Sequence, residues 1–109
     1  MMPMPKSAGA AFDPWGVRVL TISDDNTARL WDAATGAELA ALRGHKGRVL
    51  RAAFDSSGAR VLTASDDNMA RLWDAATGAE LAVLRGHKNT IFSAVFDPSG
   101  AFVLTASRD

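Results

Sequence analysis

The sequence contains no cysteine, which excludes disulfides and cysteine-ligated metals. Its twelve basic and twelve acidic residues cancel, so nothing predicts a basic surface for a nucleic-acid backbone. No apolar run approaches the roughly 18 residues that a bilayer-spanning helix requires. The opening segment, MMPMPKSAGA, lacks the apolar stretch of a secretory signal. We therefore expect a cytoplasmic protein that binds neither nucleic acid nor membrane.

What the sequence does contain is a repeat with a period of 42 residues. Between residues 17–43 and 59–85, 23 of 27 positions are identical. A third, shorter copy follows, because Phe12, Phe54 and Phe96 fall at equivalent positions. A fixed period of this size indicates a repeat architecture. Each residue therefore has to be interpreted together with its copies.

Three short motifs recur at this period, namely Gly44-His45, Ser65-Asp66-Asp67 and Trp73-Asp74. They resemble the repeat of the WD-repeat β-propellers, whose units of about 40–45 residues carry Gly-His and Trp-Asp signatures. The resemblance extends from about Ala8 to Asp109. It implies an all-β fold, a partial β-propeller built from four-stranded antiparallel blades.

The segments between the motifs have the composition of strands. Residues 17–23, 59–65 and 101–107 are apolar and β-branched with little polar alternation, which predicts strands buried on both faces. Further strands are expected at 28–32 and 70–74, and outer strands at 38–43 and 80–85. The alternative for DAATGAELAALRG is a short helix, because Ala, Glu and Leu are good helix formers.

These strands amount to about two and a half blades. We interpret residues 1–9 as a loose arm, 10–43 as a first blade, 44–85 as a second, and 86–109 as the first half of a third. Propellers typically close with four to eight blades. The chain is then either a fragment of a larger propeller or a module whose copies associate head to tail into a ring.

The resemblance also implies a buried hydrogen-bonded tetrad formed by His45, Ser65, Asp67 and Trp73. A buried indole N–H needs an acceptor, and a histidine can donate at one ring nitrogen while accepting at the other. The other two units carry only part of this set. The first has Ser23, Asp25 and Trp31 but Pro3 at the histidine position, and the third has His87, Ser107 and Asp109 without a tryptophan.

A catalytic interpretation competes with the tetrad, because Ser65, His45 and Asp67 carry the groups of a nucleophilic triad. The sequence contains no motif for calcium or phosphate binding. The Asp24-Asp25-Asn26 segment lacks the spacing of a calcium loop, and no phosphate-binding glycine loop is present. His45 and His87 stand one repeat apart, too distant to share a metal. We expect no enzyme activity, no cofactor and no metal.

In this family, partners usually bind the face formed by the loop before the first strand and the loop between the second and third. The residues that match these loops are Asp24, Asp66, Arg108, Lys46, Arg48 and Lys88. The alternative is a solvated rim of mixed charge. Trp15 replaces Ser57 and Ser99 at a hairpin tip, where it would either be covered by the arm or anchor another chain, since tryptophan is enriched at interface hot spots.

The expected function is a non-catalytic scaffold for protein–protein interaction, or a fragment of a larger WD-repeat propeller. The alternative is a self-assembling structural module that closes a propeller ring as a homo-oligomer. In either case the partners are proteins or peptides.

Overall fold

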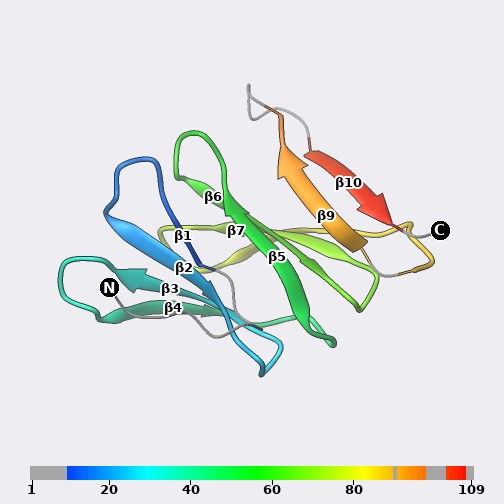
Figure 1. The fold of residues 1–109 in the computed structure, drawn as a ribbon, viewed down its shortest axis with the longest axis horizontal. Coiled ribbons are helices and arrows are strands. Elements are labelled where there is room, and N and C mark those ends of the chain that lie inside the picture. The colour runs from blue at the N-terminus through cyan, green and yellow to red at the C-terminus, as the bar shows by residue number, and fades with distance from the viewer. Residues whose placement is uncertain (1–9, 90, 98–102, 108–109) are drawn as a thin grey trace.

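The computed structural model describes residues 10–89, 91–97 and 103–107, and these residues form three antiparallel sheets. The first sheet contains β1 (Ala10–Phe12), β2 (Arg18–Ile22), β3 (Ala28–Asp32) and β4 (Glu38–Leu42). The second contains β5 (Val49–Phe54), β6 (Arg60–Ser65), β7 (Ala70–Asp74) and β8 (Glu80–Leu84). The third pairs β9 (Ile91–Phe96) with β10 (Val103–Ser107). In every sheet the strands follow chain order (Figure 1).

The hairpins that join the first two strands of each four-stranded sheet are closed by the same local chemistry. Gly16 and Gly58 adopt φ angles of +70° and +75°, which a residue with a side chain rarely adopts. Each glycine N–H donates to the carbonyl of an aspartate three residues earlier, Asp13 or Asp55, at 3.1 Å. These turns correspond to the predicted hairpin tips.

The turns between the second and third strands use asparagine in place of glycine. Asn26 and Asn68 have φ angles of 69° and 70°. Asparagine tolerates this left-handed conformation better than most residues. Because the strands alternate in direction, these turns lie at the opposite end of the sheets from the β1–β2 and β5–β6 hairpins (Figure 1).

The segments that could have formed helices are the outer strands β4 and β8. Gly36 and Gly78, at φ angles of +76° and +77°, turn the chain tightly before these strands. A register shift next to Trp31 and Trp73 then places each tryptophan opposite a glutamate of the outer strand. The strand prediction is thus confirmed, because pairing with the neighbouring strand outweighs the helix propensity of Ala, Glu and Leu.

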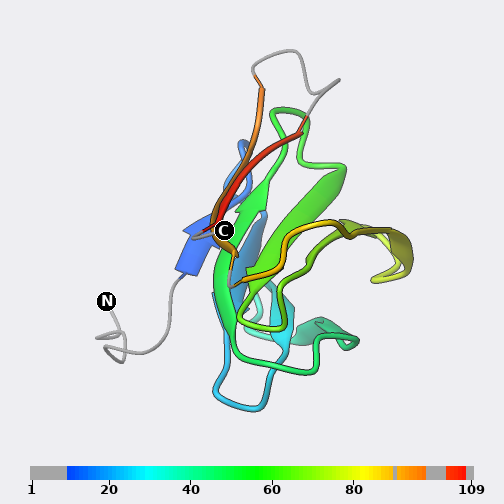
Figure 2. The ribbon, with the colours of Figure 1, turned by 90° about the vertical axis from the view of Figure 1, so that its right-hand side faces the viewer.

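The sheets stack through their inner strands. β5 packs against β1 and β2 of the first sheet, and β9 packs against β5 and β6 of the second. Figure 2 shows the β3–β4 and β7–β8 turns projecting on the same side of the molecule. One apolar core lies between the first and second sheets and includes Leu20, Leu30, Leu42, Val61 and Trp73. The other includes Leu62, Ala64 and Ala70, with Phe96 and Val103 packed against them.

Burial of equivalent strands differs between the sheets. In β6, every residue from Val61 to Ser65 is buried, as the sequence predicts for a strand covered on both faces. In β2 only Leu20 is buried, because the described residues cover this strand with a sheet on one side only. The same difference affects the aligned phenylalanines. Phe54 packs against the first core and Phe96 against the second, whereas Phe12 is 67% exposed.

The described residues thus form an all-β fold with two four-stranded antiparallel sheets and one two-stranded sheet, as expected for a partial β-propeller. The three sheets fall within residues 10–43, 44–85 and 86–109, although the exact division of the chain between blades stays an interpretation. The proposed arm, residues 1–9, lies outside the described residues. The described part of the chain contains no helix of the length and apolar character needed to cross a bilayer.

Candidate functional site

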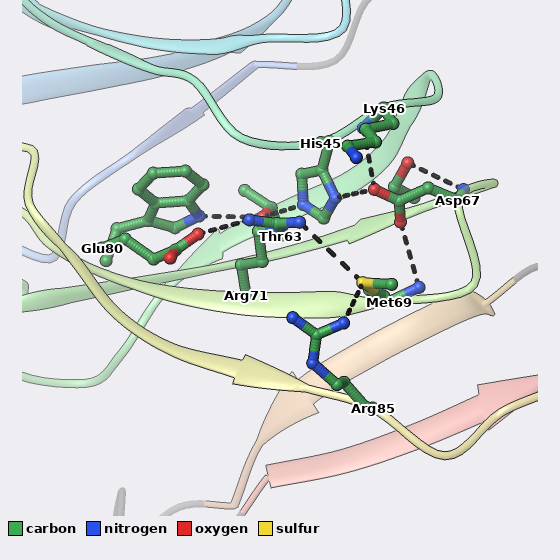
Figure 3. Close-up of polar contacts among 10 residues, drawn as sticks. His45, Lys46, Thr63, Asp67, Met69, Arg71, Glu80 and Arg85 are labelled. Atoms are coloured by element: carbon green, nitrogen blue, oxygen red, sulfur yellow. Dashed lines mark hydrogen bonds and ion pairs between the residues drawn. The ribbon is translucent and has the colours of Figure 1, made fainter.

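The loop that carries His45 runs between β4 and β5 and passes directly over the end of the second sheet (Figure 3). Gly44 makes this approach possible. A Cβ atom at this position would lie 2.8 Å from Nη1 of Arg71 and 3.2 Å from the ring of Trp73. The Gly-His pair therefore has a steric basis, since the glycine lets the backbone come close enough for the histidine to point into the blade.

His45 is the centre of a buried hydrogen-bonded chain of four side chains. Trp73 Nε1 donates to Thr63 Oγ1 at 2.9 Å, and Thr63 Oγ1 lies 2.6 Å from His45 Nε2. His45 Nδ1 lies 2.8 Å from Asp67 Oδ2. With a neutral imidazole, all these contacts are satisfied when Thr63 donates its hydroxyl proton to Nε2 and Nδ1–H donates to Asp67.

The hydroxyl of this chain belongs to Thr63, which corrects the expected position of Ser65. Ser65 is also fully buried, but its Oγ accepts the backbone N–H of Asp67 at 3.1 Å. Residues two apart on a strand point to the same face, so the sequence pattern could not separate these two hydroxyls. They stand about 7 Å apart along the strand, and only the nearer one reaches the Trp73 indole. Thr21, Thr63 and Thr105 repeat at the same period as the serines, so the repeat offers both hydroxyls and singles out neither.

Asp67 joins two backbone segments as well as holding the imidazole. Its Oδ2 also accepts the backbone N–H of Lys46, and its Oδ1 accepts that of Met69, both at 3.0 Å. The carboxylate therefore fixes the loop before β5 against the turn between β6 and β7 (Figure 3). We refer to this contact between the loop and the turn as the His45–Asp67 joint.

The environment shifts the pKa values of both charged members of the chain. Burial lowers the pKa of His45 below its ordinary 6.5, against the opposing effect of the hydrogen bond to Asp67. Burial acts to raise the pKa of Asp67, but hydrogen bonds from His45 and the Lys46 backbone outweigh it, so this pKa lies below 3.8. The favoured state is a neutral imidazole beside an ionised carboxylate.

The first sheet contains part of the same arrangement. Trp31 Nε1 donates to Thr21 Oγ1 at 2.8 Å, as in the second sheet. Asp25 is instead hydrogen-bonded by both the hydroxyl and the N–H of Thr27 and by Arg29, and these contacts hold the pKa of Asp25 well below its usual range. Ser23 also lowers this pKa through a hydrogen bond. Pro3, at the histidine position, lies outside the described residues.

The third sheet preserves the histidine contact. His87 Nε2 lies 2.8 Å from Thr105 Oγ1, again a threonine. Ser107 Oγ donates to the backbone carbonyl of Asn89 at 3.0 Å. Asp109 lies outside the described residues.

The catalytic alternative finds no support in this geometry. Ser65 Oγ accepts a backbone N–H, and both ring nitrogens of His45 are occupied by Thr63 and Asp67. Ser65 and His45 are both buried, so no substrate carbonyl can approach them. Among the residues described, no group of three His, Asp or Glu side chains is placed to hold a metal ion.

The candidate partner-binding residues separate into two groups at opposite ends of the sheets. One group consists of exposed residues in the turns and loops at the same end of the sheets as the His45–Asp67 joint, namely Asp24, Lys46, Arg48, Asp66 and Lys88. Within it, Asp66 N donates to Arg48 O at 3.1 Å, and a Cβ at Gly47 would lie 2.0 Å from Asp66 Oδ1. Arg108 lies outside the described residues. Trp15 is at the other end, 73% exposed, with Nε1 donating to Ser57 O at 3.3 Å.

Comparison with known families identifies the repeat. The family model described as WD domain, G-beta repeat, matches residues 8–32, 36–74 and 78–109. The second match runs from the β3–β4 turn to the end of β7, so one sequence unit supplies the outer strand of one sheet and three strands of the next. A comparison with curated proteins finds no match. The matched segments contain every described strand, and the chain belongs to the WD domain, G-beta repeat family, whose repeats generally form scaffolds for protein–protein interaction.

Proposed function

We propose that this chain is a non-catalytic interaction scaffold whose partner surface is the end of the sheets beside the His45–Asp67 joint. The observation that carries the proposal is the double role of Asp67. Its carboxylate binds the imidazole of His45 inside the blade and the N–H of Lys46 at the surface. Lys46 and Asp66 are therefore presented on a backbone that is fixed before any partner arrives, which reduces the entropy lost on binding.

The surface carries charges of both signs, which suits the recognition of a polar peptide or protein segment in one orientation. Lys46 and Arg48 precede β5, and Asp66 follows β6, within one short stretch of surface. All three side chains are exposed and free to meet a partner. Charge patterns of this kind set orientation and association rate more than raw affinity.

Site-specific photo-crosslinking in the cells of origin tests the proposal. A benzophenone amino acid at position 46 or 66 is expected to give discrete protein adducts. The same group at Ala33 or Ala34, exposed positions at the other end of the sheets, is the matched control and is expected not to give these adducts. In the chain with the crosslinker at position 46, Asp66→Lys should remove the adduct. Identical adducts from both ends, or none from 46 and 66, would contradict the proposal.

Self-association is the second candidate, and one observation favours it. Phe54 and Phe96 fill the contact with the preceding sheet, whereas the equivalent Phe12 is 67% exposed. The internal contacts between sheets show what kind of surface covers a phenylalanine at this position. The sheet of a second copy carries the same residues and could cover Phe12 in the same way.

Light scattering over a range of concentrations distinguishes this candidate. Self-association predicts a discrete multiple of 11.5 kDa that Phe12→Ser reduces. Leu39→Ser removes an apolar side chain that is 49% exposed on β4 and serves as the control. A mass of 11.5 kDa at every concentration would exclude the ring.

A further inference from the structure

The β1–β2 hairpin departs from its copy at one residue, and the departure changes a buried carboxylate. In the β5–β6 hairpin, Asp55 Oδ1 accepts the N–H groups of Ala59 and Arg60 at 2.9 and 3.2 Å. Its Oδ2 accepts from Ser57 Oγ at 3.1 Å and from Arg60 Nε at 3.3 Å. Both oxygens of this carboxylate are therefore occupied within the hairpin.

Asp13 repeats only half of this arrangement. Its Oδ1 accepts the N–H groups of Val17 and Arg18 at 2.8 and 3.2 Å. Trp15 stands at the position of Ser57 and has no hydroxyl to donate, and Arg18 forms no ion pair with this carboxylate. Among the described residues no donor reaches Asp13 Oδ2, although Asp13 is only 7% exposed. This oxygen still reaches solvent, since the fully buried side-chain atoms without a partner in the described residues are Arg29 Nε and Arg71 Nε, and a ligand can therefore displace water and supply the donor.

This oxygen faces a cleft between two hairpin tips and the β7–β8 turn. The cleft has a volume of about 410 Å³, and its lining includes Asp13, Trp15, Arg18, Ser57, Asp74 and Ala76. A Cβ at Gly58 would lie 3.7 Å from Asp13 Oδ2, so the oxygen points toward the second hairpin. The Trp15 indole reaches across to the Ser57 carbonyl and forms one wall of the cleft.

The residues that line the cleft favour a ligand with a positively charged group on an apolar stem. Asp13 and Asp74 contribute two carboxylates against the single guanidinium of Arg18. Charge-assisted hydrogen bonds to carboxylates are about twice as strong as neutral ones. An indole face attracts cations and also packs against methylene groups. A lysine or arginine side chain can bind the carboxylates through its cation and the indole through its stem. A purely apolar side chain could only pack against the indole, and an acidic side chain would be repelled by the carboxylates.

We propose that the cleft between the β1–β2 and β5–β6 hairpins binds a lysine or arginine side chain of a partner protein, with Asp13 Oδ2 accepting from the cation and Trp15 covering its stem. This inference rests on the proposed scaffold function, because it places the cation on a partner. It concerns the end of the sheets opposite to Lys46 and Asp66, so the crosslinking experiment above and the test below can fail independently.

The test is a titration of ¹⁵N-labelled protein with short capped peptides, Gly-Lys-Gly, Gly-Arg-Gly, Gly-norleucine-Gly and Gly-Glu-Gly, followed by NMR. The lysine and arginine peptides are expected to shift the Trp15 indole signal and the Gly58 amide in a saturable way that weakens with added salt. The indole signals of Trp31 and Trp73 should not move, because both indoles are hydrogen-bonded inside the sheets. Trp15→Phe assigns the signal.

Repeat-matched variants separate the cleft from the fold. Asp13→Asn should weaken the lysine peptide at least about tenfold, the loss expected for a charge-assisted hydrogen bond. Asp55→Asn changes the same turn in the next hairpin and should leave the affinity unchanged. Trp15→Ser restores the residue of the β5–β6 hairpin and, followed at the Gly58 amide, should abolish binding while the fold is retained. Arg18→Ala should strengthen binding, because it removes the competing cation.

Three results would overturn the proposal. The first is an equal response to the norleucine peptide, which would make the cleft an apolar anchor. The second is an unchanged affinity for the lysine peptide in Asp13→Asn with the fold retained. The third is the absence of any Trp15 shift in wild-type protein at peptide concentrations of tens of millimolar.

Discussion

The hydroxyl of Thr63 lies 2.6 Å from Nε2 of His45 inside the second sheet. It receives the indole N–H of Trp73 at the same time, so one oxygen links a loop residue to two strands. The His45 imidazole and the Trp73 indole are both buried, so neither can replace this contact with a hydrogen bond to water. Loss of this hydroxyl is therefore expected to lower the free energy of unfolding by more than the loss of one hydrogen bond, because it leaves a buried donor and a buried acceptor unsatisfied together.

Thr63→Val tests this contact with nearly no change of shape. It leaves the Trp73 N–H and His45 Nε2 unsatisfied and should lower the free energy of unfolding by about 1–3 kcal/mol. Ser65→Ala removes only the acceptor for the Asp67 N–H and should cost about 1 kcal/mol or less. Urea denaturation of both variants gives the comparison. A larger loss in Ser65→Ala than in Thr63→Val would show that the hydroxyl has been assigned to the wrong residue.

The free energy of unfolding should decrease in two steps as pH falls, one for each titrating member of the hydrogen-bonded chain, His45 and Asp67. The folded-state pKa of His45 is below 6.5, so the unfolded chain binds more protons as pH drops below 6.5, and the free energy of unfolding decreases. Asp67 also has a lowered pKa, so its contribution is present above 3.8 and is lost below it, as pH falls through the folded-state pKa. Urea midpoints across this pH range measure both steps.

His45→Gln is the control for the first of these steps, because glutamine does not titrate. The variant should be less stable than wild type at neutral pH, and the difference should narrow as pH falls below 6.5. A difference that stays constant across the range would mean that the folded protein does not keep the imidazole neutral.

Gly44 and Gly86 occupy the same position in successive repeats and offer a matched pair. Their φ angles are +156° and +135°, but only Gly44 has close neighbours. Gly44→Ala should lower stability by about 1–3 kcal/mol more than Gly86→Ala, because the new methyl group meets Arg71 and Trp73. Thermal unfolding of the two variants measures this difference. Equal losses would indicate that backbone conformation, and not contact with Trp73, requires the glycine.

Phe12 and Phe54 provide a second repeat-matched pair. Phe54→Ala should cost about 2–4 kcal/mol, since the ring packs into the core between the first two sheets. Phe12→Ala should change the stability of the monomer by about 0.5 kcal/mol or less, because this ring is exposed. Denaturation at low protein concentration, where association is suppressed, gives both values. A large loss at Phe12 under these conditions would show that another part of the chain covers it.

The strand layout of this protein could be predicted from its sequence. The period of 42 residues, the glycines and asparagines of the turns, and the apolar strands predict antiparallel sheets with nearly correct strand limits. The resemblance to the WD-repeat family implied that His45, Asp67 and Trp73 belong to one hydrogen-bonded set. These features are local or repeated, and each copy reinforces the same interpretation.

The differences between equivalent residues depend on tertiary packing. Thr63 and Ser65 share a face of β6, and the position of the Trp73 indole selects between them. Asp13 and Asp55 have the same turn, but the replacement of Ser57 by Trp15 leaves one oxygen of Asp13 open to a cleft that the second sheet completes. The physical reason is that hydrogen bonding and burial depend on neighbours brought from other strands and sheets, whereas the repeat pattern specifies only each residue's place within its own unit.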